Sequence, residues 1–223
     1  MSSREAVLGK IRKSIQVAGP DTERRAAVAA RLGTAPSGVI PARAQLPQPE
    51  QIELFSTMAD KYGATVSRVG DYDKIPAEVS NYLRERNLPA AIRIGADQRL
   101  KQADWASEKN LEIREGASDG GDLAGVSHAL AGIAETGTLA LLSGQDNPTT
   151  INFLPEHHIV VVKAADVTGD MEGVWTMLRA HSGKGEMPRA VNLVTGPSRS
   201  GDIEQTILLG AHGPRALHII IVD

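Results

Sequence analysis

From residue 50 onward, short apolar segments typical of β-strands alternate with segments in which apolar residues recur at helical spacing. The helical segments lie at residues 50–62, 75–86 and 100–107, and the strand-like segments at 64–69, 90–94 and 111–114. Strands that are separated by helices usually pair in parallel, because the helix carries the chain back along one face of the sheet. We therefore predict an α/β fold with a mostly parallel sheet flanked by helices.

The last third of the sequence continues this pattern. Residues 158–163 have the composition of a buried strand, and residues 171–181 that of an amphipathic helix. A strand at 190–195, a helix at about 201–209 and a strand at 216–222 would then form a right-handed βαβ unit.

The stretch 132–155 combines apolar runs with polar residues of the kinds that bind ligands. Its segment AETGTL, Ala134–Leu139, predicts a strand, a tight turn and a second strand, in which Gly137 takes a positive φ. A polar loop follows at residues 143–148. A carboxylate, hydroxyls and an amide thus gather at strand ends, where α/β proteins usually bind ligands. The alternative is a hairpin whose threonine and asparagine side chains only satisfy their own backbone.

A second cluster is the turn GPSRS, Gly196–Ser200, which we predict to enter the helix at about 201–209. A helix start offers unpaired backbone N–H groups and a partial positive charge, which suit a phosphate or a carboxylate. The alternative is ordinary capping by Ser198 or Ser200. Capping does not explain Arg199, whose charge disfavours a helix start unless an anion or a carboxylate such as Glu135 compensates it.

We predict that both clusters face one shared pocket, because loops that follow parallel strands gather at one edge of the sheet. Glu135 is the candidate catalytic residue, and Arg199 would bind the anion. His212 fits a loop histidine better than a catalytic base. The predicted ligand-binding residues are Thr136, Gly137, Thr138, Asn147, Thr149, Ser198, Arg199, Ser200 and His212.

The first 49 residues differ from the rest. Two helical segments within residues 1–33, the first ending at Gly19-Pro20, predict an N-terminal arm that docks on the body or on a second copy of the chain. Residues 34–49 are rich in Pro, Ala and Ser and predict an extended linker. Residues 50–223 would form the α/β domain.

Charge and hydropathy exclude several classes of protein. The net charge of −3 gives no reason to expect nucleic-acid binding. No apolar run approaches the roughly 20 residues of a membrane span, and the charged N-terminus does not resemble a signal peptide. We therefore expect a cytoplasmic protein.

The chain has no cysteine, which excludes thiolate nucleophiles, disulfides and cysteine-ligated clusters. Its six histidines show no ligand-like spacing, so we expect no bound metal. The glycine-rich nucleotide fingerprints GxGxxG and GxxxxGK[ST] are missing. We predict no cofactor.

Four segments together resemble the LUD domain family of lactate-utilisation proteins, in its LutC/YkgG branch. They are AETGTL (134–139), NFLPEHHIVVV (152–162), TGPSRSGDIE (195–204) and GAHGP (210–214). The resemblance runs over roughly residues 50–223. It implies a fold like those of NagB, RpiA and CoA transferases. It also implies an association with the oxidation of L-lactate to pyruvate, alongside two partners that carry iron–sulfur clusters.

Two functions are compatible with these observations. In the first, the chain is a non-redox subunit of a lactate-oxidising system, and it binds a small carboxylate or phosphate or holds the cysteine-rich iron–sulfur partners. In the second, it is a stand-alone enzyme of the CoA-transferase or sugar-phosphate isomerase type, with Glu135 as nucleophile or general base. The absence of cysteine favours the first.

Overall fold

The structure is a computed structural model that describes residues 2–16, 21–183, 185–203 and 206–223. The chain divides into two compact units, residues 1–39 and residues 40–223. The second unit carries the sheets. No helix in the described ranges is long and apolar enough to cross a membrane.

The first unit consists of two helices, α1 (Ser3–Ser14) and α2 (Thr22–Thr34). Ser2 and Glu5 form a capping box at the start of α1, and the Asp21 side chain caps α2. Neither helix has a buried residue. The predicted end of the first helix at Gly19-Pro20 lies outside the described residues.

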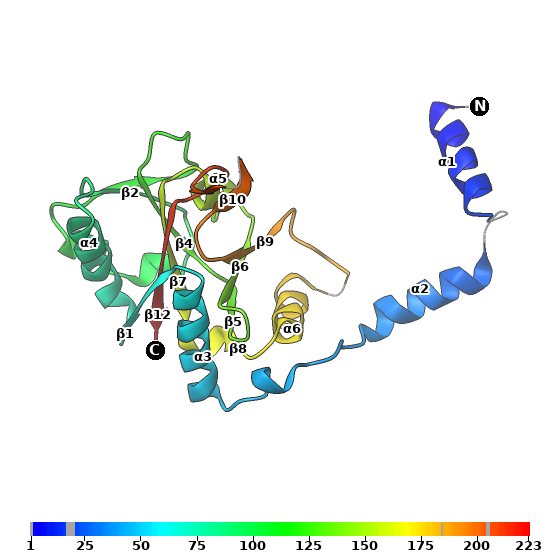
Figure 1. The fold of residues 1–223 in the computed structure, drawn as a ribbon, viewed down its shortest axis with the longest axis horizontal. Helices are drawn as coiled ribbons and strands as arrows, with labels where there is room; N and C mark the ends of the chain where they lie inside the picture. Colours follow the sequence, from blue (N-terminus) through cyan, green and yellow to red (C-terminus); the bar gives the residue numbers. More distant parts are fainter. Residues whose placement is uncertain (1, 17–20, 184, 204–205) are drawn as a thin grey trace. The chain divides into compact units, whose positions relative to one another are not determined.

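The second unit is built on a six-stranded sheet in the order β1-β12-β7-β4-β2-β3, in which all neighbouring strands are parallel (Figure 1). The strands are β1 (Thr65–Val69), β2 (Ala91–Ile94), β3 (Glu112–Glu115), β4 (Ala124–His128), β7 (His157–Lys163) and β12 (Ala216–Val222). The central strands are almost entirely buried and β-branched, as expected for a parallel sheet covered on both faces.

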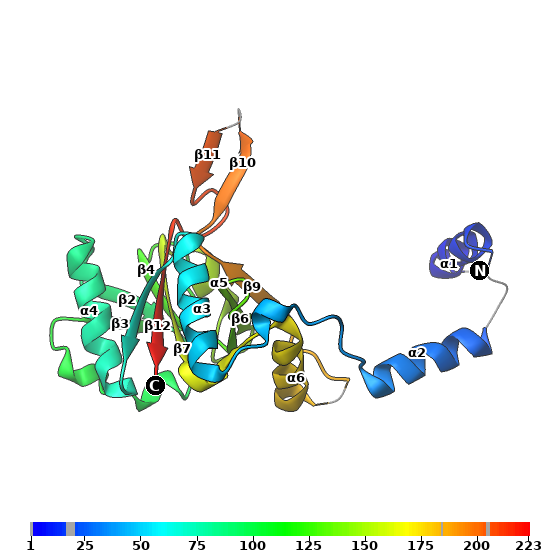
Figure 2. The ribbon, with the colours of Figure 1, turned by 60° about the horizontal axis from the view of Figure 1, so that its bottom comes forward.

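A second sheet has four strands in the order β8-β5-β6-β9, and its β5–β6 and β6–β9 pairs are antiparallel. Its strands are β5 (Ala131–Ile133), β6 (Thr138–Leu142), β8 (Val167–Thr168) and β9 (Val191–Thr195). Two further strands, β10 (Arg199–Ile203) and β11 (Thr206–Leu209), form an antiparallel hairpin. Figure 2 shows this hairpin projecting from the second unit.

Helices cover both faces of the large sheet. The helices of the second unit are α3 (Gln48–Lys61), α4 (Ile75–Glu85), α5 (Thr149–Phe153) and α6 (Met171–Ser182), with short 3-10 turns at Ala42–Ala44, Tyr72–Lys74, Leu100–Gln102, Trp105–Ser107 and Ala164–Asp166. Helix α6 packs on the four-stranded sheet. Helix α3 and the four-stranded sheet pack on the face that carries Val160 and Ile219. Helix α4 packs on the opposite face, against Ile159 and Ile220. The side chains of successive strand residues therefore belong to different layers.

The predicted α/β architecture with a mostly parallel sheet is confirmed, but two predicted helices are wrong. Residues 199–203 and 206–209 form the antiparallel strands β10 and β11 in place of the predicted helix, so the predicted βαβ unit does not exist. The predicted helix at 100–107 is two separate 3-10 turns. There, Ala103 has an extended backbone, and the indole N–H of Trp105 donates to the carbonyl of Leu100 at 2.8 Å, which breaks the helical path.

Candidate functional site

A cavity of about 270 Å³ lies between the four-stranded sheet and the amino ends of β7 and β12. We call it the motif pocket, because three of the four distinctive sequence segments line it. Its lining residues are Asn152, Phe153, His158, Leu193, Val194, Thr195, Gly196, Pro197, Ser198, Arg199, His212, Gly213, Pro214 and Leu217. All of them lie in the described part of the chain, and none is acidic.

The motif pocket is at the amino edge of the parallel sheet, whereas we predicted a site at the carboxyl edge. The prediction failed because it placed residues 190–195 in the parallel sheet. These residues form β9, which pairs antiparallel with β6 in the four-stranded sheet. The loop after β9 therefore reaches the start of β7 and β12.

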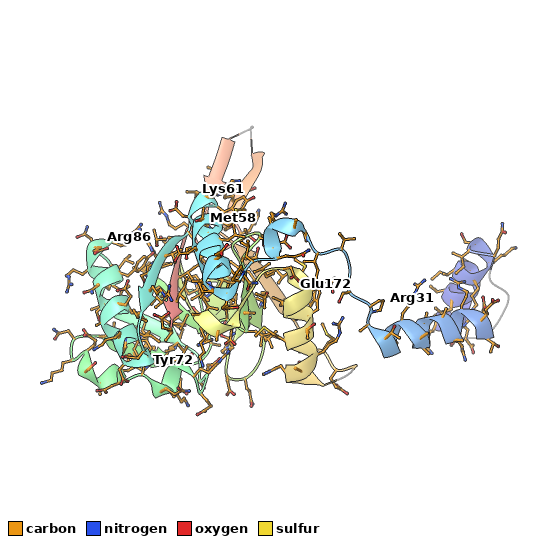
Figure 3. All side chains as sticks on the ribbon, turned by 90° about the horizontal axis from the view of Figure 1, so that it is seen from below. Arg31, Met58, Lys61, Tyr72, Arg86 and Glu172 are labelled. Carbon is orange, nitrogen blue, oxygen red and sulfur yellow. The ribbon has the colours of Figure 1, made fainter. Side chains whose placement is uncertain are left out.

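Arg199 is oriented by a helix end, but not by the helix start that we predicted. Its Nη2 donates to the carbonyl of Tyr62 at 2.6 Å, directly after the last residue of α3. The carbonyl end of a helix carries a partial negative charge, which attracts a guanidinium. Its Nη2 packs so closely on Gly63 that a Cβ there would lie 2.5 Å away. Figure 3 shows Lys61 at this end of α3, beside the hairpin.

The two serines of the turn have structural partners. The backbone N–H of His212 donates to the Ser198 hydroxyl at 3.4 Å, and the N–H of Ser198 donates to the Pro214 carbonyl at 2.8 Å. Ser200 is buried in β10, where it pairs with Leu208. The pocket thus brings Ser198, Arg199 and His212 together, with Ser198 holding the two loops side by side.

The AETGTL segment reaches the motif pocket through its hydroxyl groups. It forms the predicted strand, turn and strand, and Gly137 has the expected positive φ, 63°. The hydroxyls of Thr136 and Thr138 lie 2.8 Å apart, and that of Thr138 lies 2.7 Å from Thr195, which lines the pocket. These threonine hydroxyls thus bond to one another, and not to their own backbone as the non-ligand alternative proposed.

Glu135 does not share a cavity with Arg199. Its carboxylate is 11% exposed and lies 3.3 Å from a guanidinium nitrogen of Arg43, just before α3. Its backbone N–H donates to the Gly169 carbonyl at 3.1 Å. The prediction of one shared pocket is therefore not supported, because Glu135 lines neither the motif pocket nor the second cavity described below.

Sequence reasoning missed three buried polar residues next to the pocket. The Ser127 hydroxyl on β4 donates to Oδ1 of Asn152 at 2.9 Å, and it lies 3.0 Å from Nε2 of His158. Helix α5 can approach β4 this closely because residue 125 is glycine, where a Cβ would lie 2.8 Å from Ile151. Burial lowers the pKa of His158 to about 3, so its imidazole is neutral. The signal available in the sequence was that Asn152 and His158 are polar residues within apolar segments.

A second cavity of about 390 Å³ lies at the carboxyl edge of the sheet, lined partly by the predicted polar loop 143–147. Asn147 lines it, but its side-chain amide donates to the Leu142 carbonyl at 2.9 Å and so stabilises the loop. Thr149 begins α5 and lines neither cavity. The side chains of Asp97, Arg99 and Asp146 also line this cavity, and a guanidinium nitrogen of Arg99 lies 2.7 Å from the Asp97 carboxylate.

Buried His128 pairs with half-buried Tyr72 beside this second cavity. The backbone carbonyl of Ala129 lies 2.7 Å from Nδ1 of His128, and the Tyr72 hydroxyl lies 2.8 Å from its Nε2. A carbonyl only accepts, so Nδ1 carries the proton and the tyrosine donates to Nε2. Burial, together with the charge of Arg99, lowers the pKa of His128 to about 4, and burial raises the pKa of Tyr72.

Within the described ranges, no three His, Asp or Glu side chains are grouped so that they could hold a metal ion. The motif pocket instead carries hydroxyl, amide, imidazole and guanidinium groups, and the second cavity adds the carboxylates of Asp97 and Asp146 to groups of these kinds. Such groups suit small polar ligands.

The fold defines an α/β protein with a parallel central sheet, in which the distinctive sequence segments converge on one pocket. The chain belongs to the LUD domain family, whose model matches residues 52–222. This confirms the family resemblance that the sequence segments carry.

Several relatives are named lactate utilization protein C. The one from Geobacillus sp. (strain WCH70) is 32% identical over 120 residues, which are 53% of this chain and 48% of that relative. The one from Halalkalibacterium halodurans is 35% identical over 101 residues, 44% of each. The chain thus spans about half the length of these two relatives. The one from Geobacillus kaustophilus (strain HTA426) is 30% identical over 182 residues, 76% of this chain and 72% of that relative.

One solved structure is similar in fold. A crystal structure of a DUF162 family protein from Deinococcus radiodurans has a TM-score of 0.59 and is 20% identical, covering 80% of this chain and 99% of that chain. At this level of identity the likeness concerns the fold alone.

Proposed function

We propose that this chain is a non-redox component of an L-lactate utilisation system, in the cytoplasm, and that it binds a small carboxylate in the motif pocket. The observation that supports this most directly is the convergence of three distinctive segments on one cavity that contains a guanidinium and no acidic side chain among its described lining residues. A volume of about 270 Å³ is below the usual range for drug-sized ligands, about 300–1,000 Å³, and fits a small acid. The names of the relatives supply the metabolic context.

Arg199 is the proposed anchor for the carboxylate. A guanidinium has five N–H donors in a planar fork that matches a carboxylate, and the bond to Tyr62 uses one nitrogen of that fork. The stand-alone enzyme with Glu135 as nucleophile lacks comparable support, because Glu135 pairs with Arg43 away from the pocket.

Replacing Arg199 is expected to weaken carboxylate binding. The Arg199→Ala variant should bind L-lactate about 1.5–3 kcal/mol more weakly, roughly 10- to 150-fold, because a charge-assisted hydrogen bond is lost. Isothermal titration calorimetry would measure the change. Arg215→Ala is the matched control, since Arg215 lies nearby, pairs with Glu156 and does not line the pocket. The proposal would be contradicted if both variants lost the same affinity for L-lactate, or if the unaltered protein did not bind L-lactate.

The proposed partners are cysteine-rich iron–sulfur proteins, because this chain has no cysteine with which to hold a cluster. Affinity purification from cells that grow on L-lactate tests this. Recovery of such proteins in stoichiometric amounts would support the proposal. Isolation of this chain alone, with turnover of an acyl-CoA or a sugar phosphate, would favour a stand-alone enzyme.

We further propose that residues 1–33 mediate self-association, with residues 34–49 as their connection to the α/β domain. The two helices expose large apolar side chains, namely Val7, Ile11, Ile15, Val28 and Leu32. Apolar stripes of this kind are usually covered by another surface. Removing residues 1–33 should therefore lower the oligomeric state, as measured by light scattering, while the melting temperature of the remaining domain changes by only a few degrees. A truncated protein with unchanged mass per particle, or one that fails to fold, would refute this.

A further inference from the structure

Two residues that line the motif pocket, Asn152 and His158, each carry a buried polar atom without a partner. Within the described residues, Nδ2 of Asn152 and Nδ1 of His158 accept or donate no hydrogen bond, although Asn152 is 1% exposed and His158 is fully buried. Leaving such a group unpaired costs about 1–3 kcal/mol, so native proteins rarely do so without a function. Both residues line the same cavity.

The hydrogen bonds of Ser127 determine which of these atoms donates. The single hydroxyl proton of Ser127 goes to Oδ1 of Asn152, so the serine oxygen must accept from His158. Nε2 of His158 therefore carries the ring proton, and Nδ1 presents a lone pair. These two lining residues thus carry one unpaired acceptor, Nδ1 of His158, and one unpaired donor group, the amide of Asn152.

Burial keeps this arrangement constant over the physiological range. It lowers the pKa of His158 to about 3, so the ring remains neutral and Nδ1 remains an acceptor. No charged group other than Arg199 lines the cavity in the described part of the chain, apart from the titratable His212.

A ligand that satisfies both atoms needs a donor next to an acceptor. In a 2-hydroxy acid, the hydroxyl donates to Nδ1 of His158, and the carboxylate accepts from Asn152 and Arg199. In a 2-oxo acid, every oxygen is an acceptor, so the lone pair of Nδ1 would face another lone pair. A site that is built to pair with a hydroxyl discriminates strongly against analogues that lack it.

We propose that the motif pocket selects a 2-hydroxy acid over the corresponding 2-oxo acid, through the acceptor Nδ1 of His158 and the donor amide of Asn152. This inference rests on the proposed function, which requires only that the pocket binds a small carboxylate. It adds that the pocket distinguishes the reduced acid from the oxidised one.

Calorimetry with L-lactate, pyruvate and propionate tests the selectivity. L-lactate should bind about 10- to 100-fold more tightly than pyruvate or propionate, the equivalent of one unpaired buried group. His158→Phe should remove this preference while weak binding of all three acids remains. Equal affinity of the unaltered protein for L-lactate and pyruvate would overturn the selectivity alone, and absence of binding by all three would remove the proposed function with it.

Because His158→Phe alters a buried position, a second measurement uses the unaltered protein. With nitrogen-labelled histidine, the NMR resonance of unprotonated Nδ1 of His158 should shift when L-lactate donates to it, and should stay in place with propionate. An Nδ1 that carries the proton, or a resonance that L-lactate leaves unmoved, would overturn the proposal even if the variant does not fold.

Discussion

Lowering the pH from 7 to 5 is expected to destabilise the folded protein by about 4 kcal/mol through two buried histidines. In the fold, the pKa is about 3 for His158 and about 4 for His128, compared with an ordinary value of 6.5. Each pKa unit corresponds to about 1.4 kcal/mol, so at 1.5 units below 6.5 each histidine contributes about 2 kcal/mol.

The direction follows from which state binds the protons. Above pH 6.5, both imidazoles are neutral in the folded and the unfolded chain, and their stabilisation is fully present. As the pH falls below 6.5, the unfolded chain takes up protons that the folded chain cannot, so stability is lost until the folded pKa is reached. Burial also lowers the pKa values of His157 and His218, which act in the same direction. Asp166 opposes them, because burial raises its pKa.

Urea denaturation at pH 7, 6 and 5 would measure the loss. His128→Gln should reduce the loss of stability between pH 7 and 5 by about 2 kcal/mol, whatever its effect on stability at pH 7. His181→Gln is the matched control, since this histidine is exposed and its removal should leave the slope unchanged. If the free energy of unfolding were constant between pH 7 and 5, burial would not lower the pKa values of His128 and His158 as described.

The second large effect is expected at Gly137. Its φ is 63°, and a Cβ at this position would lie 2.4 Å from the backbone nitrogen of Ala59 and 2.6 Å from the carbonyl carbon of Met58. Both atoms belong to the backbone of α3, so they cannot move aside as a flexible side chain would. Gly137→Ala should therefore lower the free energy of unfolding by roughly 2–5 kcal/mol, from backbone strain and overpacking together.

Gly144→Ala is the control for this substitution. Residue 144 has no positive φ, and the nearest atom to an added Cβ is the Asp146 nitrogen at 3.9 Å, so the change should stay within about 0.5 kcal/mol. Thermal denaturation of both variants, followed by circular dichroism, gives the comparison. If Gly137→Ala and Gly144→Ala have the same melting temperature, the turn between β5 and β6 does not contact α3 as closely as described.

The sequence was sufficient to predict the large sheet, because its central strands are buried on both faces and appear as uninterrupted apolar runs, as in 158–163 and 216–222. It was not sufficient for residues 199–209. Apolar residues at 203, 207 and 208 fit helical spacing as well as that of a strand, and only pairing with a neighbouring segment decides between them.

The candidate site, too, could be predicted only in part from the sequence. Three of the predicted ligand-binding residues, Ser198, Arg199 and His212, line one pocket, and their binding of a ligand stays a prediction. The roles of Asn152 and His158 depend on α5 lying against Gly125, which is a contact between distant parts of the chain that no local pattern encodes. The position of Arg199 depends likewise on the end of α3, 137 residues earlier.

Strand β4 links the two cavities. Ser127 and His128 are consecutive residues, so their side chains leave opposite faces of the sheet: Ser127 bonds to Asn152 beside the motif pocket, and His128 bonds to Tyr72 beside the second cavity. A shift of this strand by one residue would exchange the two side chains and disconnect both networks at once. For protein engineering, β4 therefore has to be transferred or redesigned as a unit with both cavities.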